Sequence, residues 1–275
     1  MTDRYAVFGN PISHSLSPRI HSLFAEQTGQ DMVYRAQQVA PGEFENAAST
    51  FFAERGQGLN ITLPFKGDAY SYAARLTPRA RKAGAVNTLA KQQDGTVLGD
   101  NTDGAGLVKD ITSNLQWPIK GRKILLLGAG GAVRGVLKPL LDEMPQHVVI
   151  ANRTLEKALQ LAKGFAEEGY LLGCGMDMLE GQQFDLVING TSASLQGRLP
   201  PLPEQLLESG GNCYDMMYGA KPTPFMIWAS QHGARGIADG LGMLVEQAAE
   251  SFQLWRGVAP QTGAVIDLIR GELKS

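Results

Sequence analysis

A glycine-rich turn between a short apolar run and a helix-like stretch is the feature that most constrains the fold of this chain. Residues 124–127 read I-L-L-L, an apolar run typical of a parallel strand buried on both faces. The turn G-A-G-G follows at 128–131, and a helical pattern begins near Ala132. Such a turn lets the backbone approach a dinucleotide pyrophosphate, while the first helical N–H groups point at the phosphates. Val133 makes the motif a variant of G-x-G-x-x-G/A, and a turn that only packs a helix on a sheet is the alternative.

Composition narrows the class of protein. The chain has 275 residues, enough for two domains, and 43% of them are apolar, as in soluble globular proteins. A net charge of −2 predicts neither nucleic acid nor an anionic membrane as a partner. We expect no signal peptide, and no apolar run reaches the length of about 20 residues that a membrane-spanning helix needs. Cys174 and Cys213 lack C-x-x-C spacing, which indicates free thiols in a reducing cytoplasm, and the histidine spacing predicts no metal site.

The N-terminal segment carries hydroxyl groups at the start of a predicted helix. Ser17 precedes Pro18 and is expected to cap the helix that follows a strand at 5–8. A helix N-terminus flanked by hydroxyls is also a site for a small carboxylate, which would be held by Ser15 and Ser17. Simple helix capping, with Ser15 as part of the loop, is the alternative.

Polar residues also gather where the predicted strands of this segment end. We expect a strand over 58–64, with Leu63 on its apolar face, and a strand over 85–89. Ligands of open α/β sheets bind outside the carboxyl ends of the strands. Taken singly, Lys66 is explained as a solvated lysine and Asp103 as a helix cap. Their gathering with other polar residues on one sheet favours a site, and the set is Asn60, Thr62, Lys66, Asn87 and Asp103.

The second predicted strand of the nucleotide-binding unit, 147–151, ends in a basic segment. Sites that prefer NAD usually have Asp or Glu here, about 20 residues past the glycines. This chain has Asn152, Arg153 and Thr154 instead, and Lys157 follows within one helical turn. A carboxylate would repel a 2′-phosphate, whereas an arginine fork binds it. We therefore predict NADP rather than NAD, with Thr154 as a helix cap; a surface arginine at a helix start is the alternative.

The next two predicted strands end in residues that should face the cofactor or the substrate. Asn189 and Thr191 follow one of them and are expected to touch nicotinamide or ribose. Met216 and Tyr218 lie at the end of the other, where Tyr218 fits packing as well as binding. The glycine-rich run 236–242 suits a close approach of the backbone to a ligand, or a hinge.

The order of these elements predicts an α/β protein with two lobes and a cleft between them. Residues 1–103 would form an N-terminal α/β substrate domain, completed by the helices of 240–275. Residues 104–239 would form a Rossmann-like NADP-binding domain.

Taken together, these motifs resemble the shikimate dehydrogenase family over nearly the whole chain. The motifs that carry the resemblance are G-N-P-I-S-H-S-L-S-P (9–18), N-I-T-L-P-F-K (60–66), A-G-A-V-N-T (83–88), G-D-N-T-D-G (99–104), G-A-G-G-A (128–132), N-R-T (152–154) and A-D-G-L-G-M-L-V-E-Q-A (238–248). The resemblance implies NADPH-dependent reduction of 3-dehydroshikimate to shikimate, a step of aromatic amino-acid biosynthesis.

The resemblance also implies a role for each site residue. The substrate carboxylate would be held by Ser15 and Ser17 with Tyr218, and the ring hydroxyls would be surrounded by Thr62, Lys66, Asn87, Asp103 and Gln247. The cofactor would be bound at its pyrophosphate by Gly128, Ala129, Gly130, Gly131 and Ala132, at its 2′-phosphate by Asn152, Arg153, Thr154 and Lys157, and near nicotinamide by Met216 and Gly240.

The chain departs from the family pattern at four positions. Pro78 follows a Leu-Thr pair where the family usually has an acidic residue, and Lys157 stands where arginine is common. Val133 stands where serine is common, and Gly190 where alanine is usual. The departures at Lys157 and Val133 bear on the affinity for the cofactor and not on its identity.

We hypothesise that Lys66 is the general acid/base of hydride transfer and that Asp103 orients it. The alternatives are a quinate/shikimate dehydrogenase of broader specificity and a non-catalytic NADPH-binding sensor. We expect a cytoplasmic monomer or homodimer.

Overall fold

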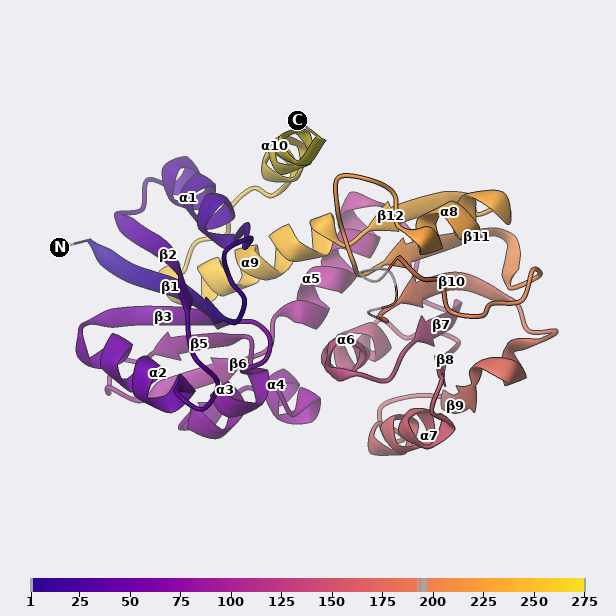
Figure 1. Ribbon diagram of the computed structural model, residues 1–275, viewed down its shortest axis with the longest axis horizontal. Coiled ribbons are helices and arrows are strands. Elements are labelled where there is room, and N and C mark those ends of the chain that lie inside the picture. Colours follow the sequence, from indigo (N-terminus) through magenta and orange to yellow (C-terminus); the bar gives the residue numbers. More distant parts are fainter. Residues whose placement is uncertain (1, 192, 194–196, 275) are drawn as a thin grey trace. The chain divides into compact units, whose positions relative to one another are not determined.

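The computed structural model describes residues 2–191, 193 and 197–274 (Figure 1). The chain forms two compact units, each discontinuous in sequence. The first runs from the N-terminus to Gly106 and includes Val245–Ile269. The second comprises Leu107–Leu244 and resumes at Arg270. The chain passes between the units inside three helices, α5 (Asp103–Lys109), α9 (Leu241–Arg256) and α10 (Gly263–Lys274).

The first unit is built on a mixed six-stranded sheet with the order β2-β1-β3-β5-β6-β4. Its strands are β1 (Asp3–Gly9), β2 (Met32–Gln38), β3 (Gly56–Ile61), β4 (Arg75–Leu76), β5 (Thr88–Lys91) and β6 (Val97–Asp100). Its helices before the first crossing are α1 (Ser17–Thr28), α2 (Phe44–Ala53), α3 (Lys66–Tyr72) and α4 (Pro78–Ala83). The strand β1 pairs in parallel with β2 and β3, and the β5 strand is antiparallel to both of its neighbours.

The second unit is built on an entirely parallel six-stranded sheet with the order β12-β11-β10-β7-β8-β9. Its strands are β7 (Lys123–Leu127), β8 (His147–Asn152), β9 (Leu171–Gly175), β10 (Phe184–Asn189), β11 (Leu207–Asp215) and β12 (Gly236–Asp239). Its helices include α6 (Gly131–Asp142), α7 (Leu155–Gly164) and α8 (Pro224–Gln231), with short helical turns η1 (Asp110–Asn114) and η2 (Met176–Leu179). Counted from β9, this is the 3-2-1-4-5-6 order of a Rossmann fold.

Each unit has its own hydrophobic core. Successive side chains of a strand point to opposite faces of the sheet, so each strand contributes to the packing on both faces. In β7, Ile124 and Leu126 pack with α6 and α7, while Leu125 and Leu127 pack with α8 on the other face. Both faces of this strand are therefore covered, as its unbroken apolar run predicted. In β1 of the first unit, Phe8 packs with the phenylalanines of α2.

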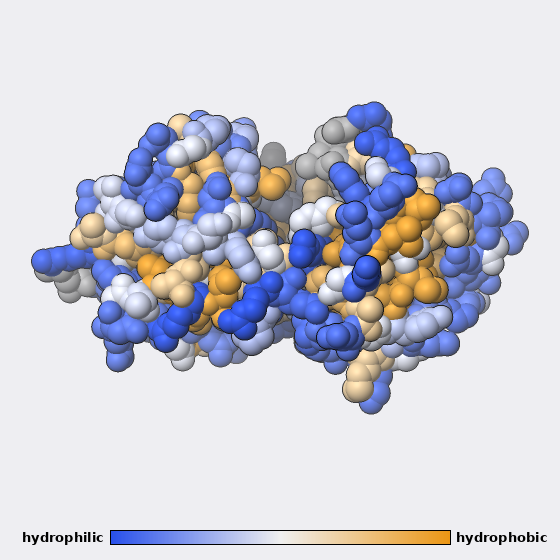
Figure 2. Space-filling model, turned by 90° about the horizontal axis from the view of Figure 1, so that it is seen from below, coloured by the Kyte–Doolittle hydropathy of each residue, from blue (hydrophilic) through white to orange (hydrophobic). Residues whose placement is uncertain are grey.

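The surface seen in Figure 2 is mostly polar, with apolar side chains interspersed on both units. Exposed apolar residues include Leu155 and Leu159 of α7 and Leu172 of β9. Among the described residues, no helix combines the length and the apolar character needed to cross a membrane.

The structure corrects the predictions for two strands. The strand expected over 58–64 ends at Ile61, because the chain turns where the Phe65 N–H donates to the Thr62 carbonyl; Leu63 is consequently 72% exposed instead of lying on an apolar face. Asn87 precedes β5 and does not lie within it.

The helix caps also differ from the prediction. Ser17 is the first residue of α1 and not its cap; its N–H donates instead to the Ser15 hydroxyl at 3.3 Å. Thr154 does occupy the cap position of α7, but its side chain makes no capping hydrogen bond.

Candidate active site

An ion pair between Lys66 and Asp103 lies at the centre of the candidate site in the first unit. Lys66 is the first residue of α3, and Asp103 is the first residue of α5. The ammonium Nζ lies 2.6 Å from Asp103 Oδ2, and the side chains are 29% and 13% exposed. Among the described residues, this is the one hydrogen bond of the Lys66 ammonium, which can donate three. The ammonium therefore has donors left for a ligand.

Asn87 holds the other side of Asp103. Its amide Nδ2 lies 2.8 Å from Asp103 Oδ1 and 3.2 Å from the Oε1 of Gln247 on α9. Its Oδ1 accepts the N–H of Thr102 at 2.9 Å. The structure thus brings together four residues that are widely separated in sequence: Lys66, Asn87, Asp103 and Gln247.

A buried polar cluster adjoins these four residues, since the Ser251 hydroxyl donates to the Gln247 carbonyl at 3.1 Å. Asn60 in β3 donates to Ser251 Oγ on α9 at 2.9 Å and accepts the Tyr34 hydroxyl at 2.7 Å. His21 lies 3.2 Å from the same Asn60 oxygen, and burial lowers the pKa of His21 to about 3. The imidazole is therefore neutral, and its Nε2–H donates, since Asn60 Oδ1 can only accept. Sequence reasoning singled out Asn60 but missed Tyr34, His21 and Ser251, which pack like ordinary helix and strand residues.

The other residues predicted for the substrate lie in both units. In the first unit, Ser15 is half-buried and Ser17 is buried at the start of α1, and Thr62 is half-buried at the turn after β3. Tyr218 belongs to the second unit, after β11. Burial, with the negative charge of Asp239, raises the pKa of the Tyr218 phenol. The phenol therefore stays protonated and can donate a hydrogen bond.

The predicted pyrophosphate turn has the geometry that such a ligand needs. Gly128 has φ +105°, a conformation that favours glycine, and its N–H donates to the Ala151 carbonyl at 2.8 Å. Gly130 is the cap of α6 and Gly131 its first residue; both are exposed, and a side-chain carbon at either would meet no atom within 4 Å. Exposed backbone N–H groups at the start of a 12-residue helix favour an anion.

Two cations lie at the end of β8. Arg153 follows the strand and Lys157 lies in the first turn of α7, and both are exposed. Within the described part of the chain, neither side chain makes an ion pair. The neighbouring Asn152 donates its Nδ2 to the Thr154 carbonyl at 2.9 Å, which orders the segment between strand and helix.

The ends of β10 and β11 are joined by hydrogen bonds. The fully buried Asn189 accepts the Thr191 N–H at 3.1 Å and hydroxyl at 2.7 Å, and donates to Asp215 Oδ1 at 3.1 Å. Its side chain therefore shapes the loop that presents Thr191. Gly240 follows β12, and a Cβ there would lie 2.2 Å from the Met216 carbonyl oxygen, so the two backbones touch.

Two of the departures from the family pattern are in contact. A Cβ at Gly190 would lie 2.4 Å from Cγ2 of Val133, which is fully buried in the first turn of α6. The branched valine thus occupies the space that an alanine at 190 would fill. The larger residue at position 133 and the smaller residue at position 190 therefore compensate for each other in volume.

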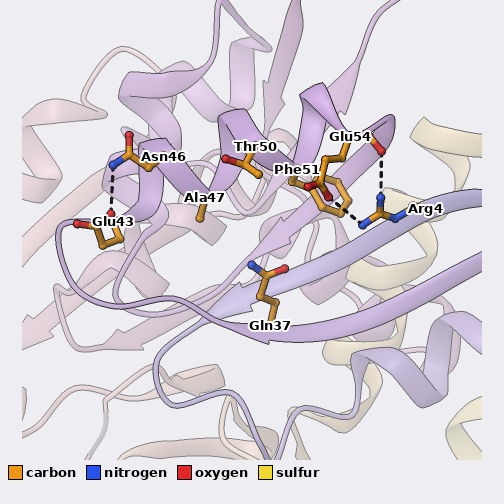
Figure 3. Close-up of a pocket in the computed structure, with 8 residues that line it drawn as sticks. All are labelled: Arg4, Gln37, Glu43, Asn46, Ala47, Thr50, Phe51 and Glu54. Carbon is orange, nitrogen blue, oxygen red and sulfur yellow. Dashed lines mark hydrogen bonds and ion pairs between the residues drawn. The ribbon is translucent and has the colours of Figure 1, made fainter.

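The pocket in Figure 3 lies elsewhere in the first unit and contains none of the predicted site residues. It has a volume of about 280 Å³ and is lined from β1, β2 and α2. Its cation, Arg4, is already paired with Glu54, at 3.6 Å between side chains, and packs 5.8 Å from the Phe51 ring. The pocket therefore offers no free charge to a small anionic ligand.

Models of known families match most of the chain. Residues 7–89 match the shikimate dehydrogenase substrate binding domain, residues 107–196 match shikimate / quinate 5-dehydrogenase, and residues 240–270 match the shikimate 5′-dehydrogenase C-terminal domain.

Individual relatives agree with these matches. A shikimate dehydrogenase (NADP(+)) of Cellvibrio japonicus is 60% identical over 273 residues, which cover 99% of each chain. An Ael1 enzyme from Pseudomonas putida has a crystal structure that is 47% identical, with a TM-score of 0.93, over 97% of this chain and 98% of that one. The shikimate 5-dehydrogenase of Thermus thermophilus in complex with NADP(H) and shikimate is 31% identical, with a TM-score of 0.87, over 99% and 100% of the two chains.

We predict that Gly190→Ala destabilises the protein and that Val133→Ser largely removes this cost. Forcing a methyl group against a buried valine costs roughly 1–3 kcal/mol. The free energy of unfolding, measured by urea titration of both single variants and the double variant, should show coupling between the two positions. Gly164→Ala at the end of α7, where a Cβ meets no atom within 4 Å, is the control and should cause no such loss. Strictly additive losses would contradict the compensation.

Proposed function

This chain belongs to the shikimate dehydrogenase family, and we propose that it interconverts 3-dehydroshikimate and shikimate with NADPH and NADP⁺. The observation that carries the proposal is the 2.6 Å contact of Lys66 with Asp103, beside amide groups of Asn87 and Gln247. Together these residues offer a proton donor, a fixed carboxylate and neutral hydrogen-bonding groups, which suit a ring that carries both a ketone and hydroxyls.

Lys66 would act as the general acid in reduction and as the base in oxidation. When bound, NADPH supplies the hydride to the ketone carbon. The ketone oxygen then gains negative charge, which the Lys66 ammonium stabilises before it donates a proton to that oxygen. Asp103 holds the ammonium through Oδ2 while Asn87 holds Oδ1, so the carboxylate positions the acid without needing to move.

The substrate carboxylate would be bound at the start of α1. Ser15 and Ser17 present hydroxyls there, and the 12-residue helix favours an anion at its N-terminus. The family resemblance assigns Tyr218 to the same carboxylate, and its phenol, which keeps its proton, can donate a hydrogen bond. Thr62 and Gln247, with Asn87, would bind ring hydroxyls.

The residues present fit NADP. The left-handed Gly128 and the exposed Gly130 and Gly131 admit a pyrophosphate at the start of α6, with Ala129 and Ala132 beside them. The exposed Arg153 and Lys157 would bind the 2′-phosphate, supported by Asn152 and Thr154. We place nicotinamide beside Met216 and Gly240, next to the loop that Asn189 and Thr191 form.

We further propose a monomer or homodimer that works in the cytoplasm and has no nucleic-acid partner. Cys174 and Cys213 are free and buried, and burial raises the pKa of Cys213 to about 12, which suits inert thiols in a reducing compartment. The net charge of −2 supports the absence of a polyanionic partner.

An absorbance assay tests the function directly. With shikimate and NADP⁺, the purified chain should produce the nicotinamide absorbance of NADPH, and rates with quinate and with NAD⁺ should be much lower. Comparable rates with quinate would support the broader enzyme instead. NADPH binding with no turnover of either acid would support a sensor and contradict the proposal.

We predict that Lys66→Ala lowers kcat by roughly 10²–10⁴-fold, the usual contribution of general acid–base catalysis. NADPH affinity, measured by its fluorescence, should change little, because the nucleotide-binding residues lie in the other unit. Lys66 and Asp103 act as a pair. Adding Asp103→Ala to Lys66→Ala should therefore lower kcat far less than Asp103→Ala does in the unaltered chain. Wild-type turnover in Lys66→Ala would exclude this role.

We predict that Arg153→Ala raises KM for NADPH and leaves the use of NADH nearly unchanged, because only NADPH carries the 2′-phosphate that the guanidinium binds. Lys157→Ala should act in the same direction more weakly. Lys163→Ala, at the other end of α7, is the control because it also removes one positive charge. This variant should prefer NADPH over NADH as strongly as the unaltered chain does. An equal loss with both cofactors in Arg153→Ala would argue against a phosphate clamp.

A further inference from the structure

Arg79 forms a fork on a buried carboxylate next to the candidate site. It lies in α4, and its Nε and Nη2 are 2.8 Å and 2.6 Å from the two oxygens of Asp100. Asp100 is the last residue of β6 and is buried. It also accepts the Thr77 hydroxyl at 2.5 Å and the Asn101 N–H at 2.7 Å. The paired geometry of the fork fixes the direction of the carboxylate as well as its position.

Asp100 begins the turn that ends at Asp103. Within this turn, the Asn101 side chain donates to the Ala85 carbonyl at 3.1 Å and accepts the Asp103 N–H at 3.2 Å. The Asp100 carbonyl accepts the Asn87 N–H at 3.0 Å. The turn is therefore anchored at its start by Arg79, and the same start contacts Asn87, the residue that holds Asp103.

Arg79 also reaches the helix that carries Gln247. Its Nη1 lies 3.3 Å from Glu250 Oε2 on α9, and the two side chains are 29% and 27% exposed. Glu250 follows Gln247 by three residues, so the two lie on neighbouring positions of one helix face. One guanidinium thus contacts both the turn bearing Asp103 and the helix bearing Gln247.

We propose that Arg79 is a positioning residue that sets the placement of Asp103 and Gln247 for the substrate, an inference that rests on the proposed function. It touches neither substrate nor cofactor in this role. Arginine suits it and lysine does not, because only the planar fork can bind both oxygens of Asp100 while a third nitrogen reaches Glu250.

Removing Arg79 has two effects, the loss of charge compensation for buried Asp100 and the loss of its positioning, and the test must distinguish them. Burial alone would raise the pKa of Asp100, but Arg79, Thr77 and the Asn101 N–H outweigh this and lower it. Removing Arg79 therefore leaves a buried, poorly compensated carboxylate, which destabilises the fold for reasons unrelated to catalysis. A variant with a neutral residue at position 100 removes that charge.

The test compares Arg79→Met, Arg79→Lys and the double variant Arg79→Met/Asp100→Asn in the full chain. Steady-state kinetics with shikimate and NADP⁺, NADPH binding by fluorescence and thermal unfolding are measured for each. Misplacement of the site by about 1 Å costs up to about 10²-fold in rate. We expect kcat/KM for shikimate to fall about 10–100-fold in Arg79→Met, with a higher KM for shikimate, and to fall less in Arg79→Lys.

The double variant distinguishes positioning from charge compensation. Its thermal stability should recover relative to Arg79→Met, while kcat/KM for shikimate stays low and the Kd for NADPH stays unchanged. Arg75→Met breaks an exposed pair with Asp94 in the same unit and should match the wild type in kinetics. Wild-type kcat/KM in the double variant or in Arg79→Met would overturn the proposal. Absence of turnover in the unaltered chain would instead overturn the proposed function.

Discussion

The Asp103 carboxylate is held on both oxygens, and the first unit is arranged so that this can happen. Lys66 binds one oxygen and Asn87 the other. Asn87 is itself fixed from two strands: its N–H donates to the Asp100 carbonyl, and its carbonyl accepts the Ile61 N–H at 2.8 Å. The mixed sheet therefore holds the two groups that we propose for proton transfer in fixed positions. A lysine and an aspartate on flexible loops could form the same ion pair, but they could not keep it in one place.

In the second unit, the candidate cofactor site depends instead on the place where the strand order of the sheet reverses. The strand β7 lies between β8 and β10 in the sheet, and the turns after β7 and β10 meet there: a Cβ at Gly128 would lie 3.3 Å from Cγ2 of Thr191. Dinucleotides bind at such a switch point because helices leave the two neighbouring strands in opposite directions. Glycines at 128 and 190 let the two turns approach closely, so backbone shape, more than side-chain chemistry, defines this part of the proposed cofactor site.

The sequence was sufficient for features whose causes are local. Buried parallel strands, the glycine turn and the basic end of β8 follow from apolar runs, backbone freedom and charge, and the fold class is confirmed. The end of β3 was misjudged because alternation continues to Leu63 after the backbone has turned. Arg79 was missed because its meaning depends on Asp100, 21 residues away, and nothing local distinguishes it from a solvated arginine. Contacts of this kind become visible only when strand order is known.

The discontinuity of the first unit has a consequence for how the protein is made. Val245–Ile269, which supplies Gln247 and Ser251 to this unit, leaves the ribosome only after the whole parallel sheet of the second unit. Until then, Asn60 and Thr88 of the nascent first unit lack their Ser251 partner. The second unit, in contrast, can assemble all six of its strands from one continuous stretch of chain. The first unit can therefore be completed only after the strands of the second have been synthesised, through contacts between distant parts of the chain.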